Sequence, residues 1–275
     1  MNMVLKQKMQ LLTLQKKGLL ATNFYNLETL HGVLKAASEL RQPLILQLTS
    51  SSIDYMGLST AVNTARTGLK EYDVEGWLHL DHGSSVDLAQ ACLDAGFDSV
   101  MIDGSELPFD ENIKITKEVV KRAAAYNANV EAELGYVAKL GQSHVRQGFT
   151  QVAEAETFVE ETGIDALAIA IGTAHGFYKE EPKLQFELLA DIHARISSIL
   201  VLHGGSGVPA AQLQHAISLG ICKINIATEI KNIFMKTLQS ILQHTQEIDL
   251  RKVFPKATNS VTGLVKEKLL IVQNN

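Results

Sequence analysis

The sequence predicts an α/β fold, a (β/α)8 TIM barrel with extra helices at the two ends of the chain. Eight short apolar runs rich in Leu, Ile and Val recur along the 275 residues, as is typical of parallel strands buried on both faces. Segments with helical spacing separate these runs, so strand and helix alternate, and the length is close to the ~250 residues of such a barrel. An open, doubly wound parallel sheet is the alternative that the same alternation allows.

The expected strands follow one another in chain order. They are residues 19–24 (LLATNF), 43–49 (PLILQLT), 76–83 (GWLHLDHG), 99–105 (SVMIDGS), 129–135 (NVEAELG), 166–172 (ALAIAIG), 199–205 (ILVLHGG) and 223–230 (KINIATEI). Between them lie good helix formers such as ENIKITKEVVKRAAAY. Ser84 or Ser85, followed by Asp87, predicts a helix start after the third run, and Pro209 suits the first turn of another helix.

Both ends of the chain predict additional helices. Leu5, Met9 and Leu12 lie at helical spacing, and Gly18 can end that helix. After Glu229 the pattern predicts one long helix and then a further helix packed outside the barrel. Because no linker, repeat or low-complexity segment divides the chain, we expect residues 1–275 to form one catalytic barrel domain.

The composition indicates a soluble globular protein, with 46% hydrophobic and 20% charged residues. A formal net charge of -5 gives no reason to expect nucleic acid or an anionic membrane as a partner. There is no signal peptide pattern and no apolar run of about 18 residues, so a cytoplasmic protein without a membrane span is expected. Two cysteines, Cys92 and Cys222, are too few for a disulfide framework and are expected to be buried thiols.

Polar side chains gather where the expected strands end. In a barrel of this type, chemistry is built at the C-terminal ends of the strands. Any one of these residues alone is explained as a capping or hydrogen-bonded group, but their recurrence at one end of successive strands predicts a functional site. They are Asn23, Thr49, Asp81, His82, Asp103, Glu133, His175, His203 and Asn225.

Three histidines from separate strands predict a metal site. His82, His175 and His203 follow the third, sixth and seventh runs and can converge across the barrel mouth. Neutral imidazole binds zinc well, and catalytic zinc sites use three protein ligands and keep one open position. A lone histidine in a barrel loop is more often structural, so a metal site is expected only because three are present together. His79, by contrast, is expected to pack in the barrel wall.

The carboxylates near these histidines have other expected roles. Strand alternation sends Asp81 to the opposite side of the chain from His82, which favours proton transfer over metal binding for Asp81. Asp103 and Glu133 can orient a histidine or hold a second cation. Hydrogen bonding to loop amides explains those two carboxylates equally well.

Two turns predict a phosphorylated substrate. HGGSG (203–207) and NIAT (225–228) end the seventh and eighth runs and lead into helices. Glycine-rich turns let backbone N–H groups approach an anion, and barrels frequently bind phosphate at these two positions.

The motifs LHLDHGSS, SVMIDGS, VEAELG, AIAIGTAHGFY, LVLHGGSGVP and KINIATEIKN, in this order, resemble the class II, zinc-dependent ketose-bisphosphate aldolases of the fructose and tagatose 1,6-bisphosphate type. The resemblance implies His82, His175 and His203 as Zn2+ ligands, Asp81 as proton donor and acceptor, and Asp103 and Glu133 as carboxylates near the metal. It also implies a dihydroxyacetone phosphate site with a monovalent cation, Na+ or K+, nearby. The substrate-binding residues expected from the strand ends and the resemblance are Asn23, Thr49, Gly176, Lys179, Gly204, Gly205, Ser206, Asn225, Ile226, Ala227 and Thr228.

The expected function is reversible cleavage of a ketose 1-phosphate or 1,6-bisphosphate to dihydroxyacetone phosphate and an aldehyde, by a homo-oligomer (a dimer or a tetramer). A metal-dependent sugar-phosphate isomerase or epimerase and a non-catalytic aldolase partner subunit are the alternatives.

One loop departs from the family pattern. Members typically carry an acidic GGxED loop after the fifth strand, whereas YVAKLGQSHVRQGFTQ has no acidic residue between Tyr136 and Gln151. Tyr136 and His144 are conceivable replacements for the missing acid. Lys139, His144 and Arg146 make the loop basic, which is compatible with an anionic group at the far end of the substrate. The altered loop leaves open a C6 substituent other than phosphate, such as a sulfonate or an uncharged group.

Overall fold

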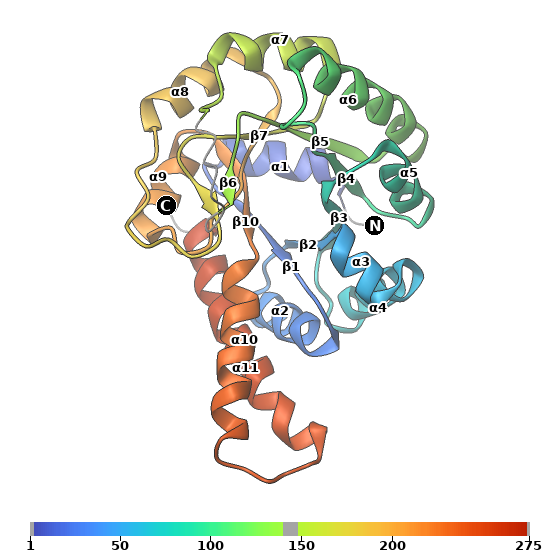
Figure 1. Ribbon diagram of the computed structural model, residues 1–275, viewed down its shortest axis with the longest axis vertical. Coiled ribbons are helices and arrows are strands. Elements are labelled where there is room, and N and C mark those ends of the chain that lie inside the picture. The colour runs from blue at the N-terminus through green and yellow to red at the C-terminus, as the bar shows by residue number, and fades with distance from the viewer. Residues whose placement is uncertain (1–2, 140–147, 274–275) are drawn as a thin grey trace.

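The computed structural model describes residues 3–139 and 148–273, and within them it confirms the (β/α)8 barrel (Figure 1). Eight parallel strands close in the order β1-β10-β9-β7-β5-β4-β3-β2. Their bounds are β1 Leu19–Asn23, β2 Leu44–Thr49, β3 Gly76–Gly83, β4 Ser99–Ile102, β5 Asn129–Leu134, β7 Ala166–Ile169, β9 Ile199–Leu202 and β10 Ile221–Ile226. A separate two-stranded sheet pairs β6 (Ala138–Lys139) with β8 (Ala174–His175).

Several strands are shorter than the sequence predicted. Asp103 and His203 lie just past the ends of β4 and β9, and the eighth strand starts at Ile221 and gives way to a helix at Thr228. Asp103 and His203 therefore belong to the loops at the C-terminal end of the barrel, where side chains are available for chemistry.

A ring of helices surrounds the barrel (Figure 1). It comprises α2 Leu27–Leu40, α3 Ser50–Met56, α4 Leu58–Glu71, α5 Val86–Asp94, α6 Phe109–Ala123 with the 3-10 turn η1 Ala124–Tyr126, α7 Val152–Thr162, α8 Phe186–Arg195 and α9 Ala210–Ser218. As predicted, α5 begins after Ser85, whose hydroxyl accepts a hydrogen bond from the Leu88 N–H at 3.1 Å. Pro209 directly precedes α9.

The predicted terminal helices are present. In α1 (Leu5–Leu14), Leu5, Met9 and Leu12 are buried, and they pack with strand residues such as Trp77 at the N-terminal end of the barrel. The helices α10 (Thr228–Leu242) and α11 (Leu250–Gln273) form a hairpin that projects beyond the barrel (Figure 1). No helix in the described part of the chain is both long and apolar enough to cross a bilayer.

The last helix returns to the barrel and is tied to its first strand. The Gly18 N–H donates to the Val272 carbonyl at 2.7 Å, and Gln273 Nε2 donates to the Gly18 carbonyl at 2.9 Å. Buried Lys268 of α11 forms an ion pair with Glu229 of α10 at 3.1 Å. These contacts fix α11 against the start of β1 and against the helix that follows β10.

Candidate active site

A cavity of about 280 Å³ opens at the C-terminal ends of the barrel strands. Its wall contains most of the residues that the strand-end pattern singled out, although these come from all parts of the chain. The lining residues are Asn23, Tyr25, Thr49, Ser51, Asp81, His82, His175, Gly176, His203, Gly204, Ser206, Asn225, Ala227, Thr228 and Lys231.

The three histidines converge in this cavity. The ring centroids of His82 and His203 are 4.7 Å apart, those of His82 and His175 5.0 Å, and those of His175 and His203 5.8 Å. One nitrogen from each ring lies within 4.8 Å of the others, which is close enough for all three to bind one metal ion. This geometry agrees with the expectation that His82, His175 and His203 converge across the barrel mouth.

His82 has an unusual backbone conformation. Its φ of 50° lies in the left-handed region, and the register between β3 and β4 shifts between Leu80 and Gly83. Strained residues of this kind cluster at functional sites. Strict alternation would send Asp81 and His82 to opposite sides, but both line the same cavity, because the irregular backbone turns the second residue back toward the barrel axis.

Hydrogen bonds determine which nitrogens face the cavity. His82 Nδ1 donates to Asp103 at 2.7 Å, and His203 Nε2 donates to Glu131 at 2.9 Å. The remaining nitrogens, His82 Nε2 and His203 Nδ1, lie 3.0 Å apart. A carboxylate that holds the far nitrogen of an imidazole is the usual support for a metal-binding histidine, because it fixes both tautomer and ring orientation.

The electrostatics of the site fit a divalent cation. Burial and the positive charge of His82 nearby lower the pKa of His203 well below its usual value, which keeps that ring neutral and able to bind metal. Burial alone would lower the pKa of His82, but Asp81, Asp103 and Glu133 raise it to about 9, so this pocket attracts positive charge. Burial raises the pKa of Glu133 to about 8, and its Oε2 has no hydrogen-bond partner. An unpaired buried carboxylate oxygen is a ready ligand or acceptor.

Asp103 and Glu133 lie as expected beside the histidines. Both form with His82 a second group whose ligand atoms could hold a metal. Asp103 also accepts hydrogen bonds from the Ser105 hydroxyl and N–H, at 2.7 and 3.2 Å. Glu133 Oε2 lies 4.0 Å from His203 Nδ1. Asp103 therefore orients His82, whereas Glu133 keeps one oxygen directed at the centre of the site.

Three side-chain amides hold the carboxylate of Asp81. Asn23 Nδ2 donates to it at 2.9 Å, Gln47 Nε2 at 3.1 Å and Asn225 Nδ2 at 3.4 Å. Burial opposes ionisation of Asp81, but the positive charges of His82 and Lys223 lower its pKa below the usual value. The oxygens of the three amides are buried and have no partner in the described structure. The site thus offers an ionised carboxylate next to three unused acceptors.

A polar layer that the sequence reasoning missed lies directly beneath the histidines. Lys223 Nζ, fully buried, donates to Glu131 at 2.7 Å and to His79 Nε2 at 3.2 Å, and His79 Nδ1 donates to the Ser99 hydroxyl at 2.8 Å. The signal was present: Glu131 and Lys223 are charged residues two positions before Glu133 and Asn225 in otherwise apolar runs. Positions i and i+2 of a strand face the same side.

Comparisons with known proteins agree with this geometry. The family model of class II fructose-bisphosphate aldolases matches residues 5–275. The chain belongs to this family. It is 39% identical over 275 residues to the D-tagatose-1,6-bisphosphate aldolase subunit GatY of Klebsiella oxytoca, covering 98% of this chain and 97% of that protein.

Solved structures of similar proteins show the same fold. The crystal structure of the YdjI aldolase from Escherichia coli K12 has a TM-score of 0.88 and 30% identity, covering 99% of this chain and 97% of that one. A putative fructose-1,6-biphosphate aldolase from Coccidioides immitis has a TM-score of 0.89 and 27% identity, covering 98% and 96%. The protein is therefore an aldolase, a carbon–carbon lyase.

The glycine-rich turn of this class II aldolase is held in a defined shape. Gly204 has a φ of 67°, and a Cβ there would lie 2.5 Å from the Ala174 carbonyl oxygen, so only glycine fits. The Tyr178 hydroxyl donates to the Gly204 carbonyl at 2.9 Å and accepts from the Ala174 N–H at 2.7 Å. The turn is thereby attached to β8, which carries His175.

Only some of the other residues expected to contact phosphate lie in the cavity wall. Ser206 Oγ accepts from the N–H groups of Ala227 and Glu229 at 3.3 and 3.4 Å, which joins the two predicted turns. Gly205 and Ile226 are buried but are not part of the cavity wall, and Lys179 is exposed outside it. The wall instead has Lys231, which the sequence reasoning missed and whose Nζ lies 5.4 Å from the ring centre of Tyr25.

The variant loop of this aldolase begins next to a histidine. Lys139 of β6 pairs with His175 of β8 in parallel register. The Tyr136 N–H donates to the Gly148 carbonyl at 3.0 Å, which closes the loop at its base. His144 and Arg146 lie outside the described residues, as does the side chain of Lys139.

Proposed function

We propose that this class II aldolase is zinc-dependent and reversibly cleaves a ketose 1,6-bisphosphate or ketose 1-phosphate of the fructose or tagatose type. The products are dihydroxyacetone phosphate and an aldehyde. The observation that carries the proposal is the convergence of three imidazoles on one point, beside an ionised Asp81 fixed by three amides. The tagatose-bisphosphate aldolase name of a 39% identical relative supports the substrate type.

His82, His175 and His203 would hold the zinc ion, with Asp103 and Glu131 fixing two of the rings. A zinc ion supplies Lewis-acid stabilisation of the negative charge that develops when the carbon–carbon bond breaks. Glu133, with its unpaired oxygen, would complete the negative lining around the metal or hold a second cation.

Asp81 would move the proton of the reaction. In cleavage its carboxylate accepts the proton of the C4 hydroxyl, and in condensation it returns this proton to the aldehyde oxygen. Asn23, Gln47 and Asn225 hold the carboxylate, so it does not have to reorganise when the proton moves. The unpaired amide oxygens of Asn23 and Asn225, which line the cavity, can accept hydrogen bonds from the sugar hydroxyls.

The phosphate of dihydroxyacetone phosphate would lie against Gly176, Gly204, Ser206 and the start of α10, which begins at Thr228. The N-terminus of α10 is suited to an anion. Lys231, one turn into this helix, adds a positive charge to the same wall. A monovalent cation, Na+ or K+, is proposed nearby on the strength of the family resemblance.

The distal end of the substrate would carry a second anionic group. The basic composition of the segment 136–150 supports a phosphate or a sulfonate at C6. We further propose that residues 1–275 form a single domain and that the protein acts in the cytoplasm as a homo-oligomer. The relative's name as an aldolase subunit supports an oligomeric protein.

The decisive experiment incubates the zinc-loaded protein with ketose 1-phosphates that differ at C4 and at C6, including the 6-phosphate and the 6-sulfonate. Release of triose phosphate from a ketose of this series, together with about one zinc per chain, is the expected result. Isomerisation or epimerisation without release of triose phosphate would overturn the proposal. The ketose 1-phosphates that differ at C6 separately identify the group at the distal end of the substrate.

A further inference from the structure

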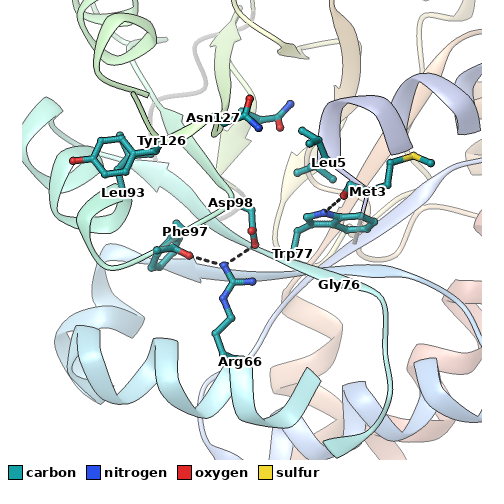
Figure 2. A pocket seen from close by; sticks show the side chains of 13 residues that line it. Met3, Leu5, Arg66, Gly76, Trp77, Leu93, Phe97, Asp98, Tyr126 and Asn127 are labelled. Carbon is teal, nitrogen blue, oxygen red and sulfur yellow. Dashed lines mark hydrogen bonds and ion pairs between the residues drawn. The ribbon is translucent and has the colours of Figure 1, made fainter. Parts of the chain in front are cut away.

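A second cavity, of about 330 Å³, lies at the opposite, N-terminal end of the barrel. It opens between the first turn of α1, the beginnings of β3 and β5, and the turns before β4 and β5 (Figure 2). It shares no residue with the wall of the active-site cavity. The mechanism proposed above uses none of its side chains.

A buried hydrogen-bond donor without a partner lines this cavity. Asn129, the first residue of β5, is 3% exposed, and its Nδ2 forms no hydrogen bond in the described structure. Buried N–H groups are almost always paired, because an unpaired one loses its bonds to water without replacement. An acceptor bound in the cavity would satisfy this amide.

The first turn of α1 adds further donors. Met3, Val4 and Leu5 line the cavity, no side chain caps the start of this ten-residue helix, and no acidic residue lies in its first turn. The first backbone N–H groups of a helix have no partners within it, and this end carries the positive part of the helix dipole. The end of α1 that faces the cavity therefore favours negative charge.

Arg66 lies at the edge of the cavity, where its guanidinium is paired with Asp98 of the same wall. Figure 2 shows its guanidinium reaching from α4 toward Asp98. Its Nη2 forms an ion pair with Asp98 at 2.8 Å and donates to the Gly96 carbonyl at 2.5 Å. Asp98 also accepts a hydrogen bond from the Leu78 N–H at 2.7 Å, so the acid in this wall is already engaged by two donors.

We propose that this cavity binds a small oxyanion, a phosphate or a carboxylate, with its oxygens toward Asn129, Arg66 and the start of α1. Trp77, Leu93 and Phe97 offer apolar surface for the organic part of such a ligand. The Trp77 indole is fixed beside the ligand position, because its Nε1 donates to the Met3 carbonyl at 3.0 Å. The site is distinct from the aldolase centre and does not depend on its substrate.

The test uses the fluorescence of Trp77, the single tryptophan of the chain. The zinc-loaded protein is titrated with inorganic phosphate and, separately, with succinate, each against chloride at equal ionic strength. A saturable change in emission with either anion is expected, and its size in the two titrations distinguishes phosphate from carboxylate ligands. No saturable change beyond that of chloride with either anion would overturn the proposal.

Two variants locate the binding. Asn129→Asp replaces the unpaired N–H by a negative oxygen, and Arg66→Gln removes the positive charge; each should weaken binding about tenfold or more, as for loss of one charge-assisted hydrogen bond. Arg66 is partly exposed, so Arg66→Gln remains informative even where Asn129→Asp fails to fold. Arg195→Gln, which alters an exposed ion pair with Glu156 on the outer helices, is the matched control and should bind normally. A signal that survives both variants but disappears in Ser206→Ala would come from the active site and would refute the proposal.

Discussion

The two ends of the barrel differ in the kind of polar atom that they leave unpaired. Among the described residues, unpaired buried oxygens of Asn23, Gln47, Asn225 and Glu133 lie around the histidines and Asp81, whereas the wall of the N-terminal cavity contains the unpaired amide nitrogen of Asn129. Oxygens attract cations and hydroxyl donors, and N–H groups attract anions. The two cavities thus differ in the kind of unpaired buried atom that a ligand can contact.

Each cavity contains both signs of charge, with Lys231 beside the acids at the C-terminal end and Asp98 beside Arg66 at the N-terminal end. Asp81, Asp103 and Glu133 surround the histidines and raise the pKa of His82 to about 9. At the other end, Arg66 is paired with Asp98, and the start of α1, which no side chain caps, adds backbone N–H donors. Between them lies the polar layer of His79, Glu131 and Lys223. Metal binding at the C-terminal end and oxyanion binding at the N-terminal end should therefore be separable by mutation.

The largest effect is expected from loss of the metal ligands. His203→Ala removes one of three imidazoles, so tight zinc binding and cleavage should both be lost, as measured by metal content and triose phosphate release. Treatment of the wild type with a chelator should abolish cleavage in the same way, and added zinc should restore it. The anion titration followed by Trp77 should stay unchanged in this variant. Unaltered zinc content would remove His203 from the ligand set.

Asp81→Ala should lower the turnover number by about 10²–10⁴, which is the usual contribution of general acid–base catalysis. Zinc content should remain near one per chain, because Asp81 does not belong to the histidine group that could bind metal. Asp81→Asn is the matched variant, since it preserves shape and removes the charge. Turnover near that of the wild type in either variant would show that another group moves the proton.

Glu131→Gln should weaken zinc binding by about 10–100-fold, because Glu131 orients His203 and such supporting carboxylates contribute to this extent. Competition with a chromogenic zinc chelator measures the affinity. Glu131→Gln leaves buried Lys223 without its anion, so the double variant Glu131→Gln/Lys223→Met separates loss of orientation from loss of folding stability. Glu161→Gln, which alters the exposed pair with Lys117, is the control. A double variant that folds and binds zinc like the wild type would contradict the role of Glu131.

The smallest effect is expected for Arg66→Gln. The ion pair with Asp98 is partly exposed, so its loss should change the free energy of unfolding by no more than about 1 kcal/mol. The kcat of cleavage should be unchanged, because Arg66 lies at the opposite end from the active site. Denaturant unfolding and steady-state kinetics measure the two quantities. A large fall in kcat would show that the two ends are coupled.

The apolar runs and their alternation with helical segments predicted the barrel, Ser84 or Ser85 followed by Asp87 predicted a helix start, and helical spacing predicted the terminal helices. The histidines could be identified because each follows a strand, and strand ends of a parallel barrel meet at one rim. The common orientation of Asp81 and His82 could not be predicted, since it depends on a left-handed residue within a strand irregularity. The position of Lys223 two residues before Asn225 in an apolar run indicated its burial, but its partner Glu131, 92 residues away, could not be identified from the sequence.

The ion pair of Glu131 and Lys223 constrains how the chain reaches its native state. Glu131 belongs to β5 and Lys223 to β10, the last strand to be synthesised. A partial barrel made of the earlier strands is open where β10 belongs and leaves Glu131 accessible to water, whereas burial of Glu131 without its cation is strongly unfavourable. The same strand that closes the sheet thus delivers the cation for Glu131, so the barrel interior becomes dry and electrically balanced in one step.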